Sequence, residues 1–165
     1  MMNSDSAKYK VNIELDKEKI FNNILKFCTY QERAESEVKE KLKKYKLSGI
    51  QTEKILKKLK EEKFIDNQRF ARIYAGGKFR NNQWGKVKIR YELMRRSINE
   101  NFIEEALELI DEYEYKQMIR KLIRKKLTTV QEEDRFILRN KIAHYIFTKG
   151  FESELVWEML NKEIQ

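Results

Sequence analysis

The sequence predicts an all-α protein built from three tandem three-helix repeats. Three observations support this class. The 165 residues contain no proline and are rich in Lys, Glu, Leu and Ile, which suit helices. Apolar residues recur at helical spacing through most of the chain. The same apolar pattern then returns twice at nearly constant offsets, which is typical of stacked helical units.

The first repeat is expected at residues 16–65, after an N-terminal arm at residues 1–15. Alternating apolar residues in this arm favour a short extended segment. Helices are expected from Asp16, at about 34–46 and at about 52–63. Gly49 is expected to interrupt the chain between the last two of them. Cys28 lies on the apolar face of the first helix, where a buried cysteine is far more common than a reactive one.

Two offsets locate the other repeats. A shift of 51 positions pairs Val38 with Ile89, Leu42 with Leu93, Leu47 with Ile98, Ile55 with Ala106, Leu56 with Leu107 and Leu59 with Ile110. A further shift of 53 pairs Ile89 with Ile142, Leu93 with Ile146, Ile98 with Phe151, Phe102 with Leu155, Ala106 with Met159 and Leu107 with Leu160. Every pair is apolar. The second repeat is therefore predicted at residues 66–112 and the third at residues 113–165.

The second repeat carries most of the net charge. Nine Lys or Arg and one acid, Glu92, lie between Arg69 and Arg96, a balance of +8 in a chain of +9. Such a stretch is typical of a surface that binds a polyanion. The candidate binding residues are Arg69, Arg72, Lys78, Arg80, Trp84, Lys86, Lys88, Arg90, Arg95 and Arg96. Trp84 is included because a tryptophan at a turn can stack on a base. A secondary basic surface is expected at Arg120, Lys121, Arg124 and Lys125 of the third repeat.

Four residues are informative about the first two helices of the second repeat. Asp66 is expected to cap its first helix, and Gly85 to open its second. Gly76 and Gly77 each cost roughly 1 kcal/mol inside a helix relative to alanine. A close approach of another backbone, or a bend, would offset that cost.

The second helix of this repeat has apolar residues on two sides. Ile89 and Leu93 form the expected inward stripe, and Val87, Tyr91 and Met94 form another on nearly the opposite side. We expect the second stripe to be covered by a neighbouring repeat or by the N-terminal arm. The alternative is that it docks a protein partner.

No residue pattern for catalysis or metal binding is present. His144 is the single histidine, expected at the edge of a buried face, so a zinc cluster or a His-activated nucleophile is excluded. No phosphate-binding or dinucleotide-binding glycine motif occurs. We expect a protein that is not an enzyme and holds no cofactor or metal. Because no apolar run is long enough for a signal peptide or a membrane span, we expect a cytoplasmic protein with no membrane contact. We also expect it to be a monomer.

Three hypotheses follow for the basic stretch. In the first, it neutralises the phosphates of single-stranded nucleic acid while aromatic side chains stack on the bases. In the second, residues 85–97 enter a major groove, as in a helix-turn-helix transcription regulator that reads double-stranded DNA. In the third, the protein is a helical scaffold that makes no contact with nucleic acid.

The chain resembles the RecX family of bacterial recombination regulators. The residues that carry the resemblance are Ser36–Glu37–Val38 with Lys41–Leu42, Leu59, Glu61 to Asp66, Arg69–Phe70–Ala71, Gly85, Lys88–Ile89, Glu92–Leu93, Ser97–Ile98, and Lys149–Gly150–Phe151 with Val156. The likeness covers nearly everything from about residue 25 onward. The family commonly has glycine at the position of Ser97.

The resemblance implies an elongated, curved helical array that modulates RecA. Family members bind the RecA filament on single-stranded DNA, block its extension, and inhibit ATP hydrolysis and strand exchange. Homologous recombination, DNA repair and the SOS response are the implied processes. Double-stranded DNA is a further partner that this likeness allows.

Overall fold

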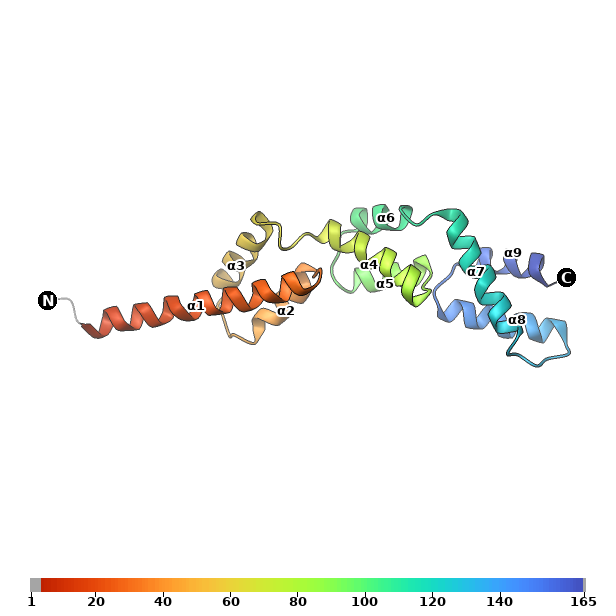
Figure 1. Cartoon of the computed structure of the whole chain (residues 1–165), viewed down its shortest axis with the longest axis horizontal. Helices are drawn as coiled ribbons and strands as arrows, with labels where there is room; N and C mark the ends of the chain where they lie inside the picture. Colours follow the sequence, from red (N-terminus) through yellow and green to blue (C-terminus); the bar gives the residue numbers. More distant parts are fainter. Residues whose placement is uncertain (1–3, 165) are drawn as a thin grey trace. The chain divides into compact units, whose positions relative to one another are not determined.

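The computed structural model of the chain describes residues 4–164, with side chains described from residue 17 onward. Within that range the chain forms helices and no strand (Figure 1), which confirms the all-α prediction. The helices are α1 (Ser4–Tyr30), α2 (Glu35–Lys43), α3 (Gly49–Glu61), α4 (Asn67–Asn82), α5 (Lys86–Met94), α6 (Glu100–Glu108), α7 (Glu112–Leu127), α8 (Arg135–Thr148) and α9 (Ser153–Glu163). None of these described helices has the length and apolar character needed to cross a membrane.

The helices follow one another in three groups of three, α1–α3, α4–α6 and α7–α9, as the sequence predicted. By contacts the chain divides into two compact units, one ending at Phe70 (unit 1) and one beginning at Ala71 (unit 2). Unit 2 contains the second and third groups apart from the first turn of α4. The predicted repeat boundaries and the curved arrangement of the repeats stay predictions.

The prediction of an extended N-terminal arm was wrong for residues 4–15, which belong to α1. Residues 1–3 of that arm lie outside the described part of the chain. Alternation over a few residues is a weak signal, and lysine- and glutamate-rich sequence without proline or glycine favours helix more strongly. The first helix therefore starts well before Asp16.

The prediction that Gly49 interrupts the chain was also wrong, because Gly49 is the first residue of α3. The residue that marks the start of α3 is instead Ser48, its N-cap, one position earlier. The Ser48 hydroxyl accepts a hydrogen bond from the Gln51 backbone N–H at 3.3 Å, and the Gln51 side chain accepts from the Ser48 N–H at 2.9 Å. This reciprocal capping satisfies two of the free N–H groups at the helix start and sets where α3 begins.

The internal repeat is visible in the backbone as well as in the apolar pattern. Lys46, Ser97 and Gly150 are related by the same offsets of 51 and 53 residues, and all three have positive φ angles, of 51°, 55° and 84°. Each of them follows the middle helix of its group and turns the chain toward the third helix. A left-handed conformation suits glycine best and strains other residues. Ser97 thus occupies a glycine-like position.

The apolar core confirms the inward stripes read from the sequence. Val38, Ile89 and Ile142 are each fully buried, as are Leu42, Leu93 and Ile146 to within 1%. In unit 1 the core joins α1, α2 and α3 and includes Cys28. Burial raises the pKa of the Cys28 thiol above its ordinary value, which supports the prediction of a buried, unreactive cysteine.

Glu35 links α2 to α3 through two lysines. Its carboxylate lies 3.0 Å from the Lys39 ammonium and 2.8 Å from the Lys60 ammonium. Partial burial alone would raise the pKa of Glu35, but the hydrogen bonds from Lys60 and Lys39 outweigh it and lower the pKa below 4.5. Because the folded-state pKa is lowered, the stabilisation is complete above pH 4.5 and is lost as the pH falls further.

Replacing Glu35 by glutamine is therefore expected to destabilise the protein by about 1 kcal/mol at pH 7 and by much less at pH 3. Urea unfolding at the two pH values measures the difference. Glu61→Gln, at an exposed carboxylate 3.8 Å from Lys57, is the control with a smaller expected effect. An equal loss for Glu35→Gln at both pH values would contradict this assignment.

Candidate nucleic-acid interface

The predicted basic stretch spans α4, the following loop and α5. Asp66 caps α4 as predicted, since its carboxylate accepts a hydrogen bond from the Arg69 N–H at 2.9 Å. Arg69 belongs to unit 1, where its guanidinium is 2.8 Å from the Glu32 carboxylate and also donates to the Lys63 carbonyl. The other nine candidate residues belong to unit 2.

Most arginines of the stretch are paired with carboxylates inside unit 2. Arg72 pairs with Glu105 of α6, and Arg90 pairs with Glu100 and Glu104 of the same helix. Arg95 and Arg96 both contact Glu92. The hydrogen bond from Arg96, followed by the charge of Arg95, lowers the pKa of Glu92. Arg72 and Arg90 therefore link α4 and α5 to α6, whereas Arg95 and Arg96 are paired locally at the end of α5. That they also contact a ligand stays a prediction.

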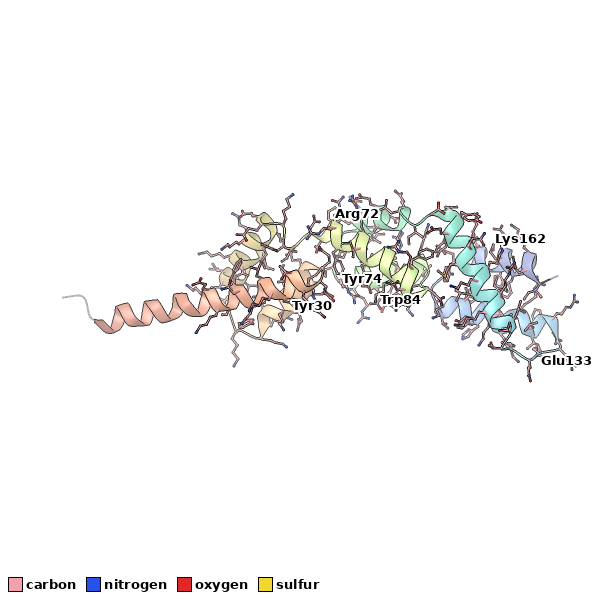
Figure 2. All side chains as sticks on the ribbon, viewed as in Figure 1. Tyr30, Arg72, Tyr74, Trp84, Glu133 and Lys162 are labelled. Atoms are coloured by element: carbon pink, nitrogen blue, oxygen red, sulfur yellow. The ribbon has the colours of Figure 1, made fainter. Side chains whose placement is uncertain are left out.

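Four cations of the stretch have no carboxylate partner among the described residues: Lys78, Arg80, Lys86 and Lys88. Two of them flank Trp84, whose ring centre lies 4.9 Å from the Lys78 ammonium and 4.7 Å from the Lys88 ammonium. We call Lys78, Trp84 and Lys88 the Trp84 cluster. Trp84 is half-buried, and in Figure 2 it lies with Tyr74 along the lower edge of this segment, whereas Arg72 lies along the upper edge. Unpaired charge is thus concentrated around one aromatic ring.

The two adjacent glycines of α4 do not bend the helix, which continues through both. A Cβ on Gly76 would lie 2.8 Å from the Arg80 guanidinium, so the missing side chain lets Arg80 fold against its own helix. Nothing lies within 4 Å of a Cβ on Gly77. The predicted close approach of a backbone is found instead at Gly85.

Gly85 opens α5, as predicted, and joins the second group to the third. Its N–H donates to the Lys149 carbonyl at 2.8 Å, and the Val87 N–H donates to the Gly150 carbonyl at 3.1 Å. A Cβ on Gly85 would come within 2.2 Å of the Gly150 carbonyl oxygen. The start of α5 is therefore held by the loop between α8 and α9.

Tyr115 of α7 strengthens the same junction. Its hydroxyl accepts from the Lys86 N–H at 2.8 Å and donates to the Glu152 carboxylate at 2.6 Å. Its ring packs between Phe79 and Phe151, with ring centres 5.7 and 5.0 Å away. Sequence reasoning missed Tyr115, because nothing in its local pattern distinguishes it from any other core aromatic.

The second apolar stripe of α5 is not covered by the described residues of unit 2. Val87, Tyr91 and Met94 are 52%, 60% and 55% exposed. The prediction of a cover was therefore wrong for the third group, the neighbouring repeat within unit 2. Cover by the first repeat or by the N-terminal arm stays a prediction. The turn at Ser97 directs α6 to the inward stripe, and the third group contacts the start of α5 through backbone atoms.

The predicted secondary basic surface on α7 also contains both paired arginines and unpaired lysines. Arg120 and Arg124 both contact Glu163 of α9, and the hydrogen bond from Arg120 lowers the pKa of that carboxyl. Lys121 and Lys125 are exposed, and neither has a carboxylate partner in the described part of the chain. Only the two lysines leave their charge free for a ligand.

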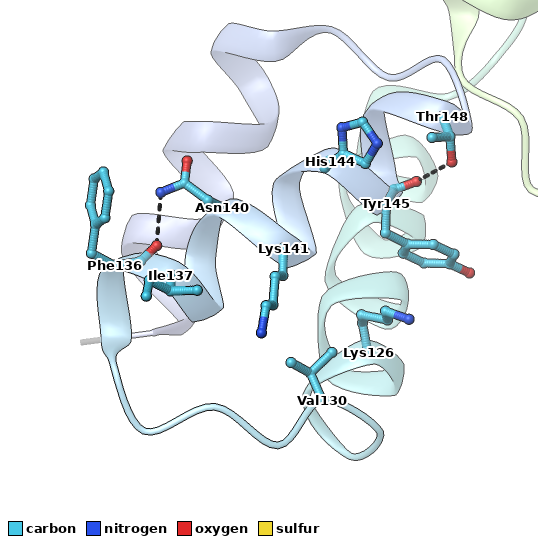
Figure 3. Close-up of a pocket in the computed structure, with 9 residues that line it drawn as sticks. All are labelled: Lys126, Val130, Phe136, Ile137, Asn140, Lys141, His144, Tyr145 and Thr148. Atoms are coloured by element: carbon cyan, nitrogen blue, oxygen red, sulfur yellow. Dashed lines mark hydrogen bonds between the residues drawn. The ribbon is translucent and has the colours of Figure 1, made fainter.

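His144 is exposed rather than at the edge of a buried face, and it lines a groove between α7 and α8 (Figure 3). Residues 142, 143 and 146 take the buried positions of α8, which turns residue 144 outward. Within residues 17–164, no three His, Cys, Asp or Glu side chains gather as a metal site would require.

Comparison with known proteins places this architecture in a family. A family model described as the second three-helix domain of RecX matches residues 66–107. The regulatory protein RecX of Clostridium tetani is 32% identical over 96% of this chain and 74% of its own length. That of Oceanobacillus iheyensis is 30% identical over 84% of this chain and 51% of its own length.

Solved structures give the same result. A crystal structure of RecX from Lactobacillus salivarius superimposes with a TM-score of 0.81 over 90% of this chain and 96% of its own, at 24% identity. A second crystal structure, of regulatory protein RecX, gives a TM-score of 0.83 over 99% of this chain and 80% of its own, at 26% identity. Together with the match to the Clostridium tetani protein, these findings confirm the resemblance read from the sequence: the chain belongs to the RecX family.

Proposed function

We propose that this protein modulates RecA by binding its filament on single-stranded DNA. In this role it blocks filament extension and inhibits ATP hydrolysis and strand exchange, and so affects recombination, DNA repair and the SOS response. The observation that carries the proposal is the 32% identity to a regulatory protein RecX over 96% of the chain. The protein acts as a cytoplasmic monomer, without a cofactor and without catalysing a reaction of its own.

The charge distribution supports this role. A binding protein for a nucleoprotein filament needs cations that are not neutralised internally, because only those release counterions from phosphates or meet acidic protein surfaces. The Trp84 cluster supplies such cations beside an aromatic ring. The charges of the paired arginines on α4 and α5 are offset by carboxylates of the same unit.

The direct test is RecA turnover of ATP on single-stranded DNA, measured as purified protein is added. We expect turnover to fall with increasing protein and to approach a low plateau. Unchanged turnover at saturating protein would contradict the proposal. Bovine serum albumin at the same concentration is the control for nonspecific effects.

Selection from random DNA duplexes tests the alternative, a transcription regulator that reads a specific sequence. We expect no enriched site. Arg90 is paired with Glu100 and Glu104 of α6, so its charge is already directed toward its own unit rather than toward a major groove. An enriched motif that depends on α5 would favour the alternative.

A further inference from the structure

We infer that the nucleic-acid-binding surface continues from the second three-helix group onto the third, as a track of alternating aromatic rings and lysines that accepts single-stranded nucleic acid. The inference rests on the proposed function and extends its site. The track consists of Tyr74, Lys78, Trp84, Lys88, Lys126, Tyr145 and Lys149. All of these residues belong to unit 2.

The first half of the track lies on α4 and α5. The Lys78 ammonium is 5.2 Å from the centre of the Tyr74 ring and 4.9 Å from that of Trp84. The Lys88 ammonium lies 4.7 Å from the centre of the Trp84 ring. Aromatic rings and cations therefore alternate along this edge of the second group.

Lys88 connects the two halves of the track, because it contacts both Trp84 of the second group and Thr148 of the third. Its ammonium donates to the Thr148 carbonyl at 3.3 Å, and the Thr148 hydroxyl donates to the Tyr145 carbonyl at 2.6 Å. The backbone contacts of Gly85 and Gly150 hold the two groups in register at this point. The next aromatic ring, Tyr145, has the ammonium groups of Lys126 and Lys149 at 5.0 and 5.9 Å.

Beyond Tyr145 the track opens into a groove of about 780 Å³ between the end of α7 and α8. Figure 3 shows Lys126 and Val130 on one side of the groove, with Ile137, Lys141 and Tyr145 on the other. Apolar and aromatic walls with lysines at the rim suit a base that leaves water while its phosphate stays at the edge. The groove therefore offers a strand the same combination of apolar surface and lysines as the rest of the track.

The charges along the track favour a polyanion. Lys78, Lys88, Lys126 and Lys149 have no carboxylate partner in the described part of the chain, whereas Lys141 is 2.7 Å from Glu132. Contacts between a lysine and a half-buried ring at the surface are weak enough to be exchanged for a phosphate when a strand binds. A single strand is favoured over a duplex because its base faces are free to stack on the rings.

Binding of labelled oligothymidine, and of an abasic strand of the same length, tests the track without RecA. Tyr145→Ala is expected to weaken oligothymidine binding by roughly 5- to 100-fold and abasic binding far less, because the lost contact is stacking. Replacing Lys126 and Lys149 together by glutamine is expected to reduce the salt dependence by about 1.4 in slope, at about 0.7 per phosphate contact. Tyr30→Ala and Lys54→Gln, at exposed positions of unit 1, are the matched controls.

Loss of binding that is equal for Tyr145→Ala and Tyr30→Ala, or no loss in either, would overturn the track. So would a wild-type protein that binds neither strand. The lysine variants keep the test valid if Tyr145→Ala fails to fold. RecA turnover separates the two proposals: suppression that is insensitive to the track variants would leave the proposed function standing without the track. If strand binding depends on the track but RecA turnover is not suppressed, the track stands and the proposed function is contradicted.

Discussion

Replacing Gly85 by alanine is expected to destabilise unit 2 by about 3 kcal/mol, because the added methyl group would overlap backbone atoms that have no room to move. The nearest atoms to a Cβ there are the Gly150 carbonyl oxygen at 2.2 Å and the Phe151 nitrogen at 2.4 Å. Gly150→Ala is expected to cost at least as much. Its Cβ would come 2.2 Å from that of Lys88, and its φ of +84° strains any L side chain.

Gly77→Ala is the matched control for these substitutions. Gly77 lies inside α4, and nothing is within 4 Å of a Cβ at that position. Alanine there should stabilise the helix by roughly 0.5–1 kcal/mol. Urea unfolding followed by circular dichroism measures all three variants. Wild-type stability for Gly85→Ala would show that the second and third groups are not in contact at this junction.

Replacing Tyr115 by phenylalanine is expected to destabilise unit 2 by about 1–3 kcal/mol, although the ring and its packing are retained. The loss arises because the hydroxyl accepts from the Lys86 N–H and donates to Glu152, and both groups lose a partner. Tyr113→Phe is the control, since Tyr113 is 70% exposed on the same helix. An equal, small effect for both variants would contradict the bridging role of Tyr115.

The same substitution has a predicted signature at high pH. Burial, followed by the hydrogen bond to Glu152, raises the pKa of Tyr115 above its ordinary value of 10.0. A raised folded-state pKa means that the stabilisation is complete below pH 10 and is lost as the pH rises further. Stability measured from pH 8 to pH 11 should therefore fall more steeply for the wild-type protein than for Tyr115→Phe. Parallel curves would count against this pKa shift.

Helix positions and core residues were predictable because a single physical signal determines both. Apolar residues at helical spacing mark the side of a helix that leaves water, and Val38, Ile89 and Ile142 are buried as this pattern indicated. The offsets of 51 and 53 residues extend to the left-handed turns at Lys46, Ser97 and Gly150. Local pattern therefore predicts which residues each three-helix group buries, although it misplaced the start of α1 and the start of α3.

The pairing of charges could not be predicted in this way. The basic stretch reads as +8 in sequence, but Arg72 and Arg90 find their carboxylates on α6, and Arg69 finds Glu32, which is 37 positions away. Contacts between residues distant in sequence depend on how helices pack, and composition carries no record of them. For the same reason the sequence did not show that the third group leaves the second stripe of α5 exposed.

We propose that the unpaired lysines, rather than the paired arginines, act on the RecA filament. RecA turnover of ATP on single-stranded DNA tests it most directly, with two double variants confirmed to be folded: Lys78→Gln with Lys88→Gln, and Arg72→Gln with Arg90→Gln. We predict that the lysine variant loses at least about tenfold in inhibitory potency, from the loss of two phosphate contacts, while the arginine variant stays close to wild type. Equal inhibition by the lysine variant and the wild-type protein would contradict the account.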